Sequence, residues 1–294
     1  MLEILLIMFN KKSKVWFNGK ICLAEDINIS IFTHALHYGT AIFEGCRAYN
    51  GRVFKMKEHN ERLINSGNMV DVPVGYSVDE LNNATNNVLM ENNLTNAYIR
   101  PIAWRGDENL GVKSKYNSVN VAIFAWEWGT YFGDDKIAAG INLAPTKYVR
   151  PDPRSTETQA KASGLYFIGA NMQNKCSVDG YDDVLMLDWQ GYVAECTSCN
   201  IFFIKDMELH TPIPNCFLNG ITRQTIMNLG VKIGYKVIER KIMPQELSSF
   251  ESAFTTGTAV EVMPVNSIFD IYKYPNKSKV LEIRNEYLKL VNAS

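Results

Sequence analysis

The sequence predicts an α+β protein of two domains, and three observations lead to this class. Strand-like and helix-like segments occur in both halves of the chain. A turn-rich segment, residues 129–135, separates the halves. With 294 residues and 46% hydrophobic content, the chain can bury a large core. We expect a small N-terminal domain over residues 1–126, a linker over 127–136 and a larger C-terminal domain over 137–294, with a cleft where the domains meet.

Two Asn-Gly pairs predict tight hairpins near the start of the chain. Asn18-Gly19 and Asn50-Gly51 each separate two apolar runs. A two-residue hairpin turn needs positive φ at both central residues, which Asn and Gly adopt readily. We therefore expect four short strands before the first helix.

Helices and longer strands follow in the first half. We expect a helix over residues 57–69 and a second one that starts after Ser77. Ser77 and Glu80 have the spacing of a capping box, in which each side chain bonds the other residue's backbone N–H. Residues 97–104 and 119–126 are rich in β-branched and aromatic residues, which favours strands.

The second half alternates short strands with helices around a proline-rich loop. Residues 150–153 contain two prolines, which deny the backbone a helix. An apolar helix is expected to begin near Gly164. The other expected elements are strands at 141–144, 183–187, 200–204 and 253–256, a helix that begins near Thr222 and a terminal helix over 279–291.

The charge pattern argues against nucleic-acid and membrane partners. The formal net charge is −1 and the basic residues are dispersed. Residues 1–9 are apolar, but the run is too short to span a bilayer and its charges follow it. We expect this segment to be an extra strand or helix packed on the body, or a start-site artefact, and the protein to be soluble and cytoplasmic.

The six cysteines do not predict a disulfide framework or a metal centre. Cys196 and Cys199 have redox-motif spacing, but a zinc site would need a second pair, and the other cysteines are scattered singly. A thioredoxin-like role would need a βαβ context that the pattern does not show. We expect the pair to be small residues that pack a turn beside a site, and we expect no metal.

Lys161 is the most informative residue of the chain. It lies between small residues just before the helix near Gly164, with the hydroxyl of Tyr166 five residues away. Small neighbours can press a lysine into a cavity, and burial disfavours its ammonium form. Such a lysine can attack an aldehyde to form a Schiff base, although most lysines are simply solvated surface residues.

Nine short motifs place Lys161 in a wider pattern. They are HALHYGT (34–40), FEGCR (43–47), EHNERL (58–63), AYIRP (97–101), QAK (159–161), GYVAE (191–195), NIF (200–202), GITR (220–223) and GTAVE (257–261). In this order and at these separations they resemble the fold-type IV, pyridoxal-phosphate-dependent aminotransferases, and most closely the branched-chain amino acid aminotransferases. The resemblance runs from about residue 15 to about residue 265.

The resemblance implies that pyridoxal 5′-phosphate is the cofactor, and it implies which residues of this chain contact it. Lys161 would form the Schiff base and carry the proton between the substrate's α-carbon and the cofactor. Glu195 would pair with the pyridine nitrogen, and Tyr166 would donate to the phenolic oxygen. The helix that opens at Gly220 presents backbone N–H groups to an anion, as helix N-termini do. The expected phosphate partners are Arg62, Ile221, Thr222 and Thr258.

The resemblance also implies where substrates bind. Tyr98 and the turn Thr258-Ala259 would hold the α-carboxylate, and Arg100 would receive the side-chain carboxylate of glutamate. Tyr38 would reach in from a neighbouring subunit, which makes the protein at least a homodimer. The apolar side-chain pocket is expected to be walled by Phe43, Gly45, Trp128, Tyr131 and Tyr166, with Trp126 assigned to core packing.

The implied reaction moves the amino group between L-leucine, L-isoleucine or L-valine and 2-oxoglutarate, with L-glutamate and branched 2-oxo acids as the other partners. Three alternatives remain: a D-amino acid aminotransferase, an aminodeoxychorismate lyase-like enzyme, and a redox or binding module that uses Cys196 and Cys199. Two segments depart from the family pattern. Residues 196–199 replace a glycine-rich linker, and the approach to Lys161, residues 150–158, is unusually charged, so that Arg154 and Glu157 are expected to be loop residues.

Overall fold

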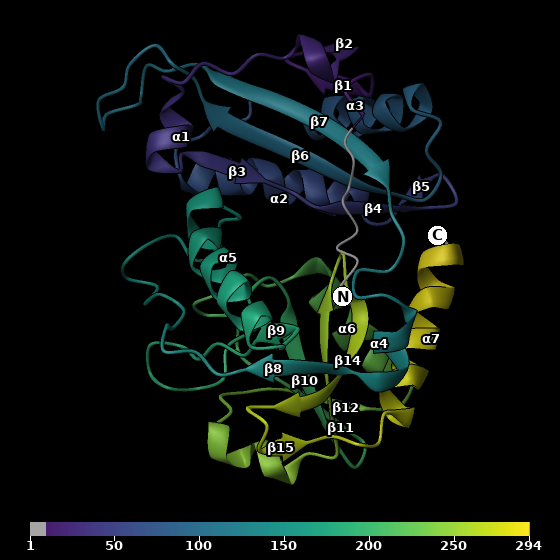
Figure 1. Ribbon diagram of the computed structural model, residues 1–294. Helices are drawn as coiled ribbons and strands as arrows, with labels where there is room; N and C mark the ends of the chain where they lie inside the picture. The colour runs from purple at the N-terminus through teal and green to yellow at the C-terminus, as the bar shows by residue number, and fades with distance from the viewer. Residues whose placement is uncertain (1–9, 294) are drawn as a thin grey trace. The chain divides into compact units, whose positions relative to one another are not determined.

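The computed structural model describes residues 10–293, in two compact units. The first unit ends at Trp128 and the second begins at Gly129. This division falls inside the segment expected to be a linker, 127–136, of which residues 134–136 belong to helix α4 (Asp134–Ala139). The apolar segment 1–9, expected to pack on the body, lies outside the described residues. Each unit is described by itself, and Figure 1 labels its elements.

The first unit is built on a seven-stranded antiparallel sheet in the order β2-β1-β7-β6-β4-β5, with β3 also paired to β6. Both predicted Asn-Gly hairpins are confirmed: Asn18 and Asn50 have φ of 46° and 50° and join β1 to β2 and β4 to β5. The strands are β1 (Lys14–Phe17), β2 (Lys20–Leu23), β3 (Ala41–Phe43), β4 (Cys46–Tyr49), β5 (Arg52–Val53), β6 (Ala97–Arg105) and β7 (Val119–Glu127).

Two long helices cover one face of this sheet (Figure 1). Helix α2 (Met56–Met69) packs on β3 and on α3 (Val78–Glu91), and α3 packs on β1 and β7. The capping box predicted at Ser77 and Glu80 is present with both of its bonds. A short helix, α1 (His34–Tyr38), and a 3₁₀ turn (Ala24–Asp26) precede β3, and neither was expected from the sequence.

The second unit contains an eight-stranded mixed sheet in the order β12-β11-β10-β13-β14-β8-β9, with β15 paired to β14. The strands are β8 (Ile141–Ala144), β9 (Asp183–Val184), β10 (Asn200–Lys205), β11 (Glu208–Thr211), β12 (Lys236–Glu239), β13 (Ser252–Gly257), β14 (Glu261–Ile268) and β15 (Tyr272–Lys273). The expected strand over 183–187 is therefore shorter, and Leu187 forms only an isolated bridge with Val193.

The helices of the second unit pack on this sheet and hold its core. Helix α6 (Ile221–Lys232) and helix α7 (Ser278–Ala293) contact each other and β13, and α7 also packs on β14. Helix α5 (Ser163–Val178) packs on β9. Ile201, Phe203 and Val265 are fully buried in the central hydrophobic cluster.

Strand β14 was not predicted, and Pro264 explains why. Proline lacks an N–H and normally argues against a central strand. In the structure Pro264 pairs with Phe254 of β13, whereas β8 pairs with β14 only from Val265 onward. Pro264 therefore lies at a position where one edge of β14 is not hydrogen-bonded to a neighbouring strand, so that its missing N–H is tolerated.

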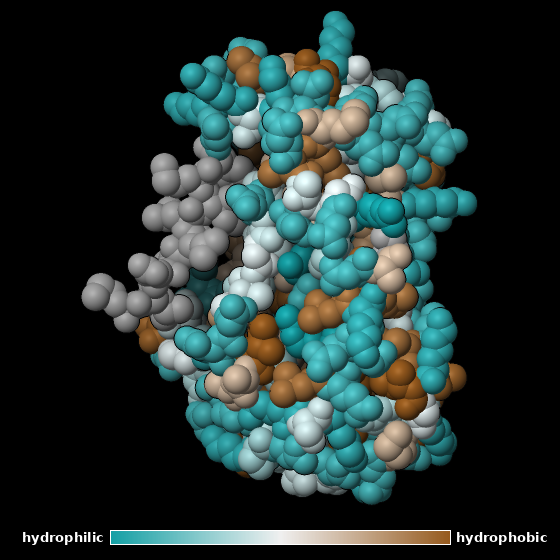
Figure 2. All heavy atoms as spheres, turned by 90° about the vertical axis from the view of Figure 1, so that its right-hand side faces the viewer, coloured by the Kyte–Doolittle hydropathy of each residue, from teal (hydrophilic) through white to brown (hydrophobic). Residues whose placement is uncertain are grey.

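The surface over α7 is a mixture of polar and apolar residues. Figure 2 shows this side with hydrophilic residues in teal over most of the described atoms and brown residues in separate small groups. Within residues 10–293, no helix is long and apolar enough to cross a membrane.

Candidate active site

Lys161 and Tyr166 lie in contact at the start of α5. The Nζ atom of Lys161 donates to the hydroxyl of Tyr166 at 2.5 Å, and it lies 4.7 Å from the centre of the tyrosine ring. One turn later, a Cβ at Gly169 would lie only 2.6 Å from the carbonyl oxygen of Thr197. The absence of a side chain at Gly169 therefore lets α5 pack closely against the turn that follows Glu195. The helix that begins beside Lys161 and the turn that carries Glu195 are thus in contact.

Glu195 is buried and paired with Arg150. Arg150 Nη2 lies 2.6 Å from Glu195 Oε1, and both side chains are almost fully buried. Burial raises the pKa of the Glu195 carboxyl to about 7, while the positive charges of Arg150 and Lys161 oppose that rise. The surface position that a glutamate after a hairpin turn could take is thus excluded. Nε of Arg150 is also buried, and the described residues supply no acceptor for it.

Asn200 connects Glu195 to the loop before α6. Its Nδ2 donates to Glu195 Oε2 and to the carbonyl of Leu218, each at 3.1 Å. Gly220 packs against the same side chain, since a Cβ there would lie 2.3 Å from Asn200 Oδ1. Asn200 and Gly220, which belong to two separate motifs, are therefore in contact, and Asn200 also binds the Glu195 carboxylate.

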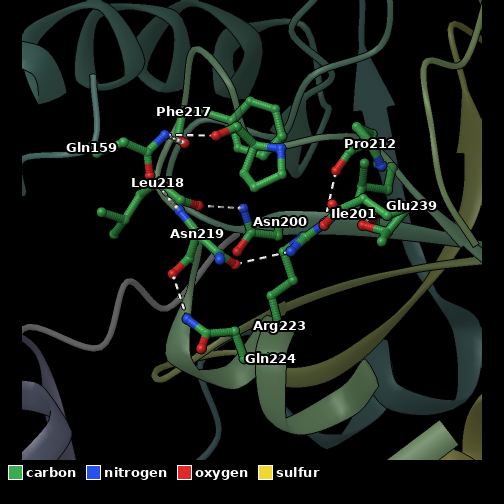
Figure 3. Close-up of polar contacts among 12 residues, drawn as sticks. Gln159, Asn200, Ile201, Pro212, Phe217, Leu218, Asn219, Arg223, Gln224 and Glu239 are labelled. Carbon is green, nitrogen blue, oxygen red and sulfur yellow. Dashed lines mark hydrogen bonds and ion pairs between the residues drawn. The ribbon is translucent and has the colours of Figure 1, made fainter. Parts of the chain in front are cut away.

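Gln159, two residues before Lys161, holds the same loop from the other side (Figure 3). Its Nε2 donates to the carbonyls of Pro214 at 2.6 Å and Phe217 at 2.8 Å, and its Oε1 accepts from the N–H of Asn219 at 3.4 Å. The approach to Lys161 and the loop that leads into α6 are thus fixed to each other by one side chain.

Arg223 anchors the first turn of α6 from below (Figure 3). Its guanidinium donates to Asn219 Oδ1 and to the carbonyl of Pro212, both at 2.9 Å, and forms an ion pair with Glu239. Gln224 donates to the carbonyl of Asn219 at 3.1 Å. These contacts keep the N-terminus of the helix in one orientation.

The N-terminus of α6 and the β13–β14 turn are the two anion-binding candidates of this unit. The first N–H groups of a helix, here those of Ile221 and Thr222, have no intrahelical acceptor and favour an anion. Thr258 and Ala259 lie in the turn between β13 and β14. Glu261 ends that turn, and its carboxylate accepts from Arg284 of α7 at 2.8 Å.

Four of the predicted substrate residues lie around a fifth, Tyr98 on β6, in the first unit. A Cβ at Gly45 would lie 1.9 Å from the Tyr98 hydroxyl, so that only glycine fits beside this ring. The Arg100 guanidinium lies 4.8 Å from the Phe43 ring and 5.5 Å from the Tyr98 ring, and the Trp128 ring lies 5.1 Å from Tyr98. Tyr98 and Arg100 share a strand face, as their spacing predicted.

Trp126, which was assigned to core packing, is half-buried and belongs to the same aromatic group. Its ring lies 5.1 Å from that of Tyr98 and 6.0 Å from that of Trp128. No local signal indicated this position, because an aromatic residue inside a strand is usually a core residue.

Arg62 lies on α2 and is held by a buried carboxylate. Its Nε and Nη2 donate to Glu44 at 2.6 and 2.9 Å, and His59 Nδ1 lies 2.7 Å from the same carboxylate. Although burial opposes it, the charges and hydrogen bonds of Arg62 and His59 keep the pKa of Glu44 well below its usual range. The arginine is thus oriented by a residue 18 positions earlier in the chain.

Two further predicted residues, Tyr38 and Tyr131, are partly exposed. Tyr38 is 46% exposed on α1, where its hydroxyl donates to the carbonyl of Leu110 at 3.3 Å. Tyr131 is 45% exposed in the second unit and packs edge-on against Phe132. Arg154 is an exposed loop residue paired with Asp152, as expected.

Arg150, Gln159, Glu44 and Arg284 were not predicted as site residues. Arg150 was placed in a loop beside prolines, and its partner is 45 residues later in the chain. Glu44 carried the only usable signal, since a carboxylate inside an apolar strand-like run must find a partner when it is buried.

The residues of the second unit fit a phosphorylated pyridine aldehyde. A lysine amine in contact with a phenol suits the aldehyde and its neighbouring hydroxyl, a buried carboxylate suits a protonated ring nitrogen, and a helix N-terminus suits a phosphate. The buried Nε of Arg150 adds a donor for which the described residues supply no acceptor.

Comparison with known proteins agrees with this chemistry. A family model for class IV amino-transferases matches residues 41–268. The probable branched-chain-amino-acid aminotransferase of Rickettsia conorii is 40% identical over 285 residues, which cover 94% of this chain and 95% of that protein. The branched-chain amino acid aminotransferase structure from Escherichia coli superposes with a TM-score of 0.92 at 34% identity and covers 96% of each chain.

A second solved structure includes the cofactor in its amino form. The T.th. branched-chain amino acid aminotransferase with pyridoxamine 5′-phosphate superposes with a TM-score of 0.92 at 33% identity, covering 96% of this chain and 95% of that one. Further structures of that protein are complexed with N-(5′-phosphopyridoxyl)-L-glutamate and with 4-methylvaleric acid.

The chain therefore belongs to the class IV aminotransferases, which are pyridoxal-phosphate enzymes, and within that class to the branched-chain amino acid aminotransferase family. This confirms the predicted fold class, the cofactor and the enzyme class.

Proposed function

We propose that the enzyme transfers the amino group of L-leucine, L-isoleucine or L-valine to 2-oxoglutarate, with Lys161 as the residue bonded to the cofactor. The contact between Lys161 and Tyr166, within electrostatic reach of the buried Glu195, is the observation that carries this proposal. When bound, pyridoxal phosphate supplies an aldehyde that receives the amino group and a ring that accepts electrons from the substrate's α-carbon.

Each of these three residues has one task in the proposal. Lys161 Nζ would take the proton from the substrate's α-carbon as a general base and deliver it, as a general acid, to the carbon that carries the cofactor's aldehyde. The Tyr166 hydroxyl orients that amine through the hydrogen bond at 2.5 Å. Glu195 binds the ring nitrogen, and Arg150 helps to keep its carboxylate ionised although it is buried.

The phosphate is proposed to bind at the N–H groups of Ile221 and Thr222, with Thr258 and Arg62 as further donors. The helix N-terminus supports the first pair, and the network of Gln159, Asn219 and Arg223 supports its fixed position. For Arg62, the bidentate contact with Glu44 supports a fixed guanidinium plane.

The substrate pocket is proposed to use the aromatic group of the first unit. Phe43, Gly45, Trp128 and Tyr131, together with Tyr166, would contact the branched side chain. Tyr98 and the turn Thr258-Ala259 would hold the α-carboxylate. Arg100 would receive the γ-carboxylate of glutamate, and its position on the Phe43 and Tyr98 rings supports a role that needs both an apolar and a charged surface. The relatives bound to glutamate-derived and branched ligands agree with such dual recognition.

We also propose that the enzyme is at least a homodimer in which Tyr38 reaches the partner's site. Two segments near Tyr38 expose large apolar side chains and are joined by the contact of His34 Nε2 with the carbonyl of Gly111 at 3.0 Å. The exposed residues are Ile31, Phe32, Leu36, Val112 and Tyr116, each between 57% and 79% exposed. Such a patch favours a protein interface, and light scattering of the purified protein tests it.

A half-reaction assay with Arg100→Met tests the substrate assignment. We expect this variant to react with L-leucine at close to the wild-type rate and to lose at least about tenfold in kcat/KM for L-glutamate, because one charge-assisted bond is removed. Arg52→Met, exposed on the edge strand β5, is the matched control and should change neither rate. Equal loss for both substrates would contradict the assignment of Arg100.

A further inference from the structure

Asp183, Cys196 and Cys199 form a buried cluster that the aminotransferase reaction does not use. The carboxylate and the two Sγ atoms all lie within 4.8 Å of one another. The three side chains are 3%, 0% and 5% exposed, and both thiols are free. The sequence predicted no metal site because a second cysteine pair is absent, but the structure brings a carboxylate from β9 to the existing pair.

Asp183 is a buried carboxylate for which the described residues supply no ammonium or guanidinium partner. Its Oδ1 accepts from the N–H of Val184 at 2.7 Å and from the N–H and hydroxyl of Thr197 at 3.3 and 2.7 Å. Its Oδ2 lies 3.8 Å from Cys199 Sγ. Buried carboxylates are normally paired with a cation or bound to a metal.

The two cysteines are held together by a tight turn. The N–H of Cys196 donates to the carbonyl of Cys199 at 2.8 Å, so that the chain reverses within four residues. Both sulfurs are buried, and neither forms a disulfide.

Thr255 lies beside Cys199. Its side chain is fully buried on β13, and its hydroxyl forms no hydrogen bond of ordinary geometry among the described residues. The hydroxyl lies within weak hydrogen-bonding reach of the Cys199 sulfur. It can therefore donate to that sulfur when the sulfur binds a cation, as the outer partners of metal ligands do.

We propose that Asp183, Cys196 and Cys199 bind a thiophilic divalent cation of the zinc class. Two sulfurs and a carboxylate oxygen are three of the four donors of a tetrahedral ion, and a water can supply the fourth. With bonds of about 2.3 Å to sulfur and about 2.0 Å to oxygen, the ligand atoms of such a site lie about 3.5–3.8 Å apart, and Oδ2 and Sγ of Cys199 are already 3.8 Å apart. On binding, the ion takes two thiolate electron pairs and releases two protons to solvent.

The hydrogen bonds of the Asp183 carboxylate are those of a metal ligand rather than of an ion-pair partner. The hydrogen bonds to Oδ1 orient the carboxylate, as partners of ligating carboxylates do. Oδ2 accepts a weak hydrogen bond from the Cys199 thiol, which the cation would replace. The chain holds one other buried cluster of ligand type among its described residues, Glu44, Cys46 and His59. There the charge of Glu44 is already balanced by Arg62, so that a cation is not needed.

The cluster lies at the turn between Glu195 and Asn200, so that a bound ion would stabilise this turn. Cys196 follows Glu195 directly, and Cys199 precedes Asn200, which donates to Glu195. An ion at this point would fix both ends of the turn that carries the proposed partner of the ring nitrogen. We expect it to stabilise the enzyme without entering the reaction.

Elemental analysis and zinc absorption spectroscopy of the holoenzyme test the proposal. The protein is purified under reducing conditions without chelator, incubated with Zn²⁺ and desalted. We expect about one zinc per chain and, in the extended fine structure at the zinc edge, a sulfur shell of two atoms at about 2.3 Å. This spectrum needs no variant, and an oxygen- and nitrogen-only shell would overturn the proposal.

Variants locate the ion. Cys196→Ser combined with Cys199→Ser is expected to lower the zinc content at least tenfold, and Asp183→Asn to lower it measurably. Cys216→Ser, which removes a buried cysteine outside the cluster, should keep it. Retention of the cofactor's visible band reports that each variant is folded. Zinc content below one ion per ten chains in the wild type, or equal content in the double variant and Cys216→Ser, would contradict the site.

Discussion

Arg150 Nη2 lies 2.6 Å from Glu195 Oε1, with both side chains buried. This pair supplies a positive charge that favours the ionised form of a buried carboxylate, which the proposed contact with the cofactor's ring nitrogen needs. It also shows that an arginine from a proline-rich loop is buried in the second unit.

Replacement of Arg150 tests the pair. Arg150→Met leaves Glu195 buried without its main cation, and we expect the free energy of unfolding to fall by about 3 kcal/mol, since breaking a buried pair strands a charge. Urea unfolding measures this. Arg154→Met, four residues away in an exposed pair with Asp152, should leave stability unchanged. Equal stability of both variants would show that the buried pair does not contribute.

Gln159 is predicted to fix the loop before α6 relative to Lys161. Gln159→Ala removes hydrogen bonds to Pro214, Phe217 and Asn219. At about 1 kcal/mol for each of two good bonds, we expect cofactor affinity to fall at least about tenfold. Cofactor release on dilution, followed by absorbance, measures it.

The control for Gln159 is Gln224→Ala, which removes one exposed bond to the carbonyl of the same Asn219. It should bind the cofactor almost as well as the wild type. If both variants released the cofactor equally fast, the loop would not depend on Gln159.

Gly45 is predicted to be required because of Tyr98. A Cβ at position 45 would lie 1.9 Å from the Tyr98 hydroxyl, so that Gly45→Ala must displace this ring. Steady-state assays should show KM for L-leucine raised at least about tenfold, an effect of the size of one or two kilocalories per mole. Gly129→Ala, whose Cβ would meet nothing within 4 Å, is the control. An unchanged KM in Gly45→Ala would place the pocket elsewhere.

Asp183 should make the metal-free, cofactor-free protein less stable as pH rises. Its carboxyl has a pKa of about 6 in the folded state and about 3.9 when unfolded. The folded state therefore binds more protons between these values, and its stability falls as pH rises through 6. Between pH 5 and pH 7.5 this amounts to about 1 kcal/mol.

Asp183→Asn removes this titration. Urea unfolding at both pH values, with chelator present, should show that the variant loses about 1 kcal/mol less than the wild type over this interval. The same pH slope in both proteins would mean that the folded carboxyl titrates normally.

Local signals in the sequence predicted much of the fold. The Asn-Gly turns, the Ser77 capping box and helix α2 depend on a few neighbouring residues, so that their chemistry is visible without a structure. Strand β14 was missed, because whether Pro264 is tolerated depends on where β8 begins to pair.

Residues of the candidate site could be predicted only where they belong to one of the recognised sequence motifs or lie close to one. Lys161, Tyr166 and Glu195 were identified by motif order, and the structure brings them into one unit. Arg150 and Asp183 were not identified, since each meets its partners only through tertiary packing across a dozen or more residues. Charged side chains near prolines give no local sign of burial.

The measurement that tests the central claim most directly is the visible spectrum of the pyridoxal-phosphate-loaded enzyme, before and after addition of L-leucine. D-alanine is the parallel sample, and Lys161→Ala is the control that should show no lysine-bound cofactor band. The account predicts that L-leucine, and not D-alanine, converts the band to that of the pyridoxamine form, and that 2-oxoglutarate restores it. Conversion by D-alanine alone, or a wild-type band in Lys161→Ala, would contradict it.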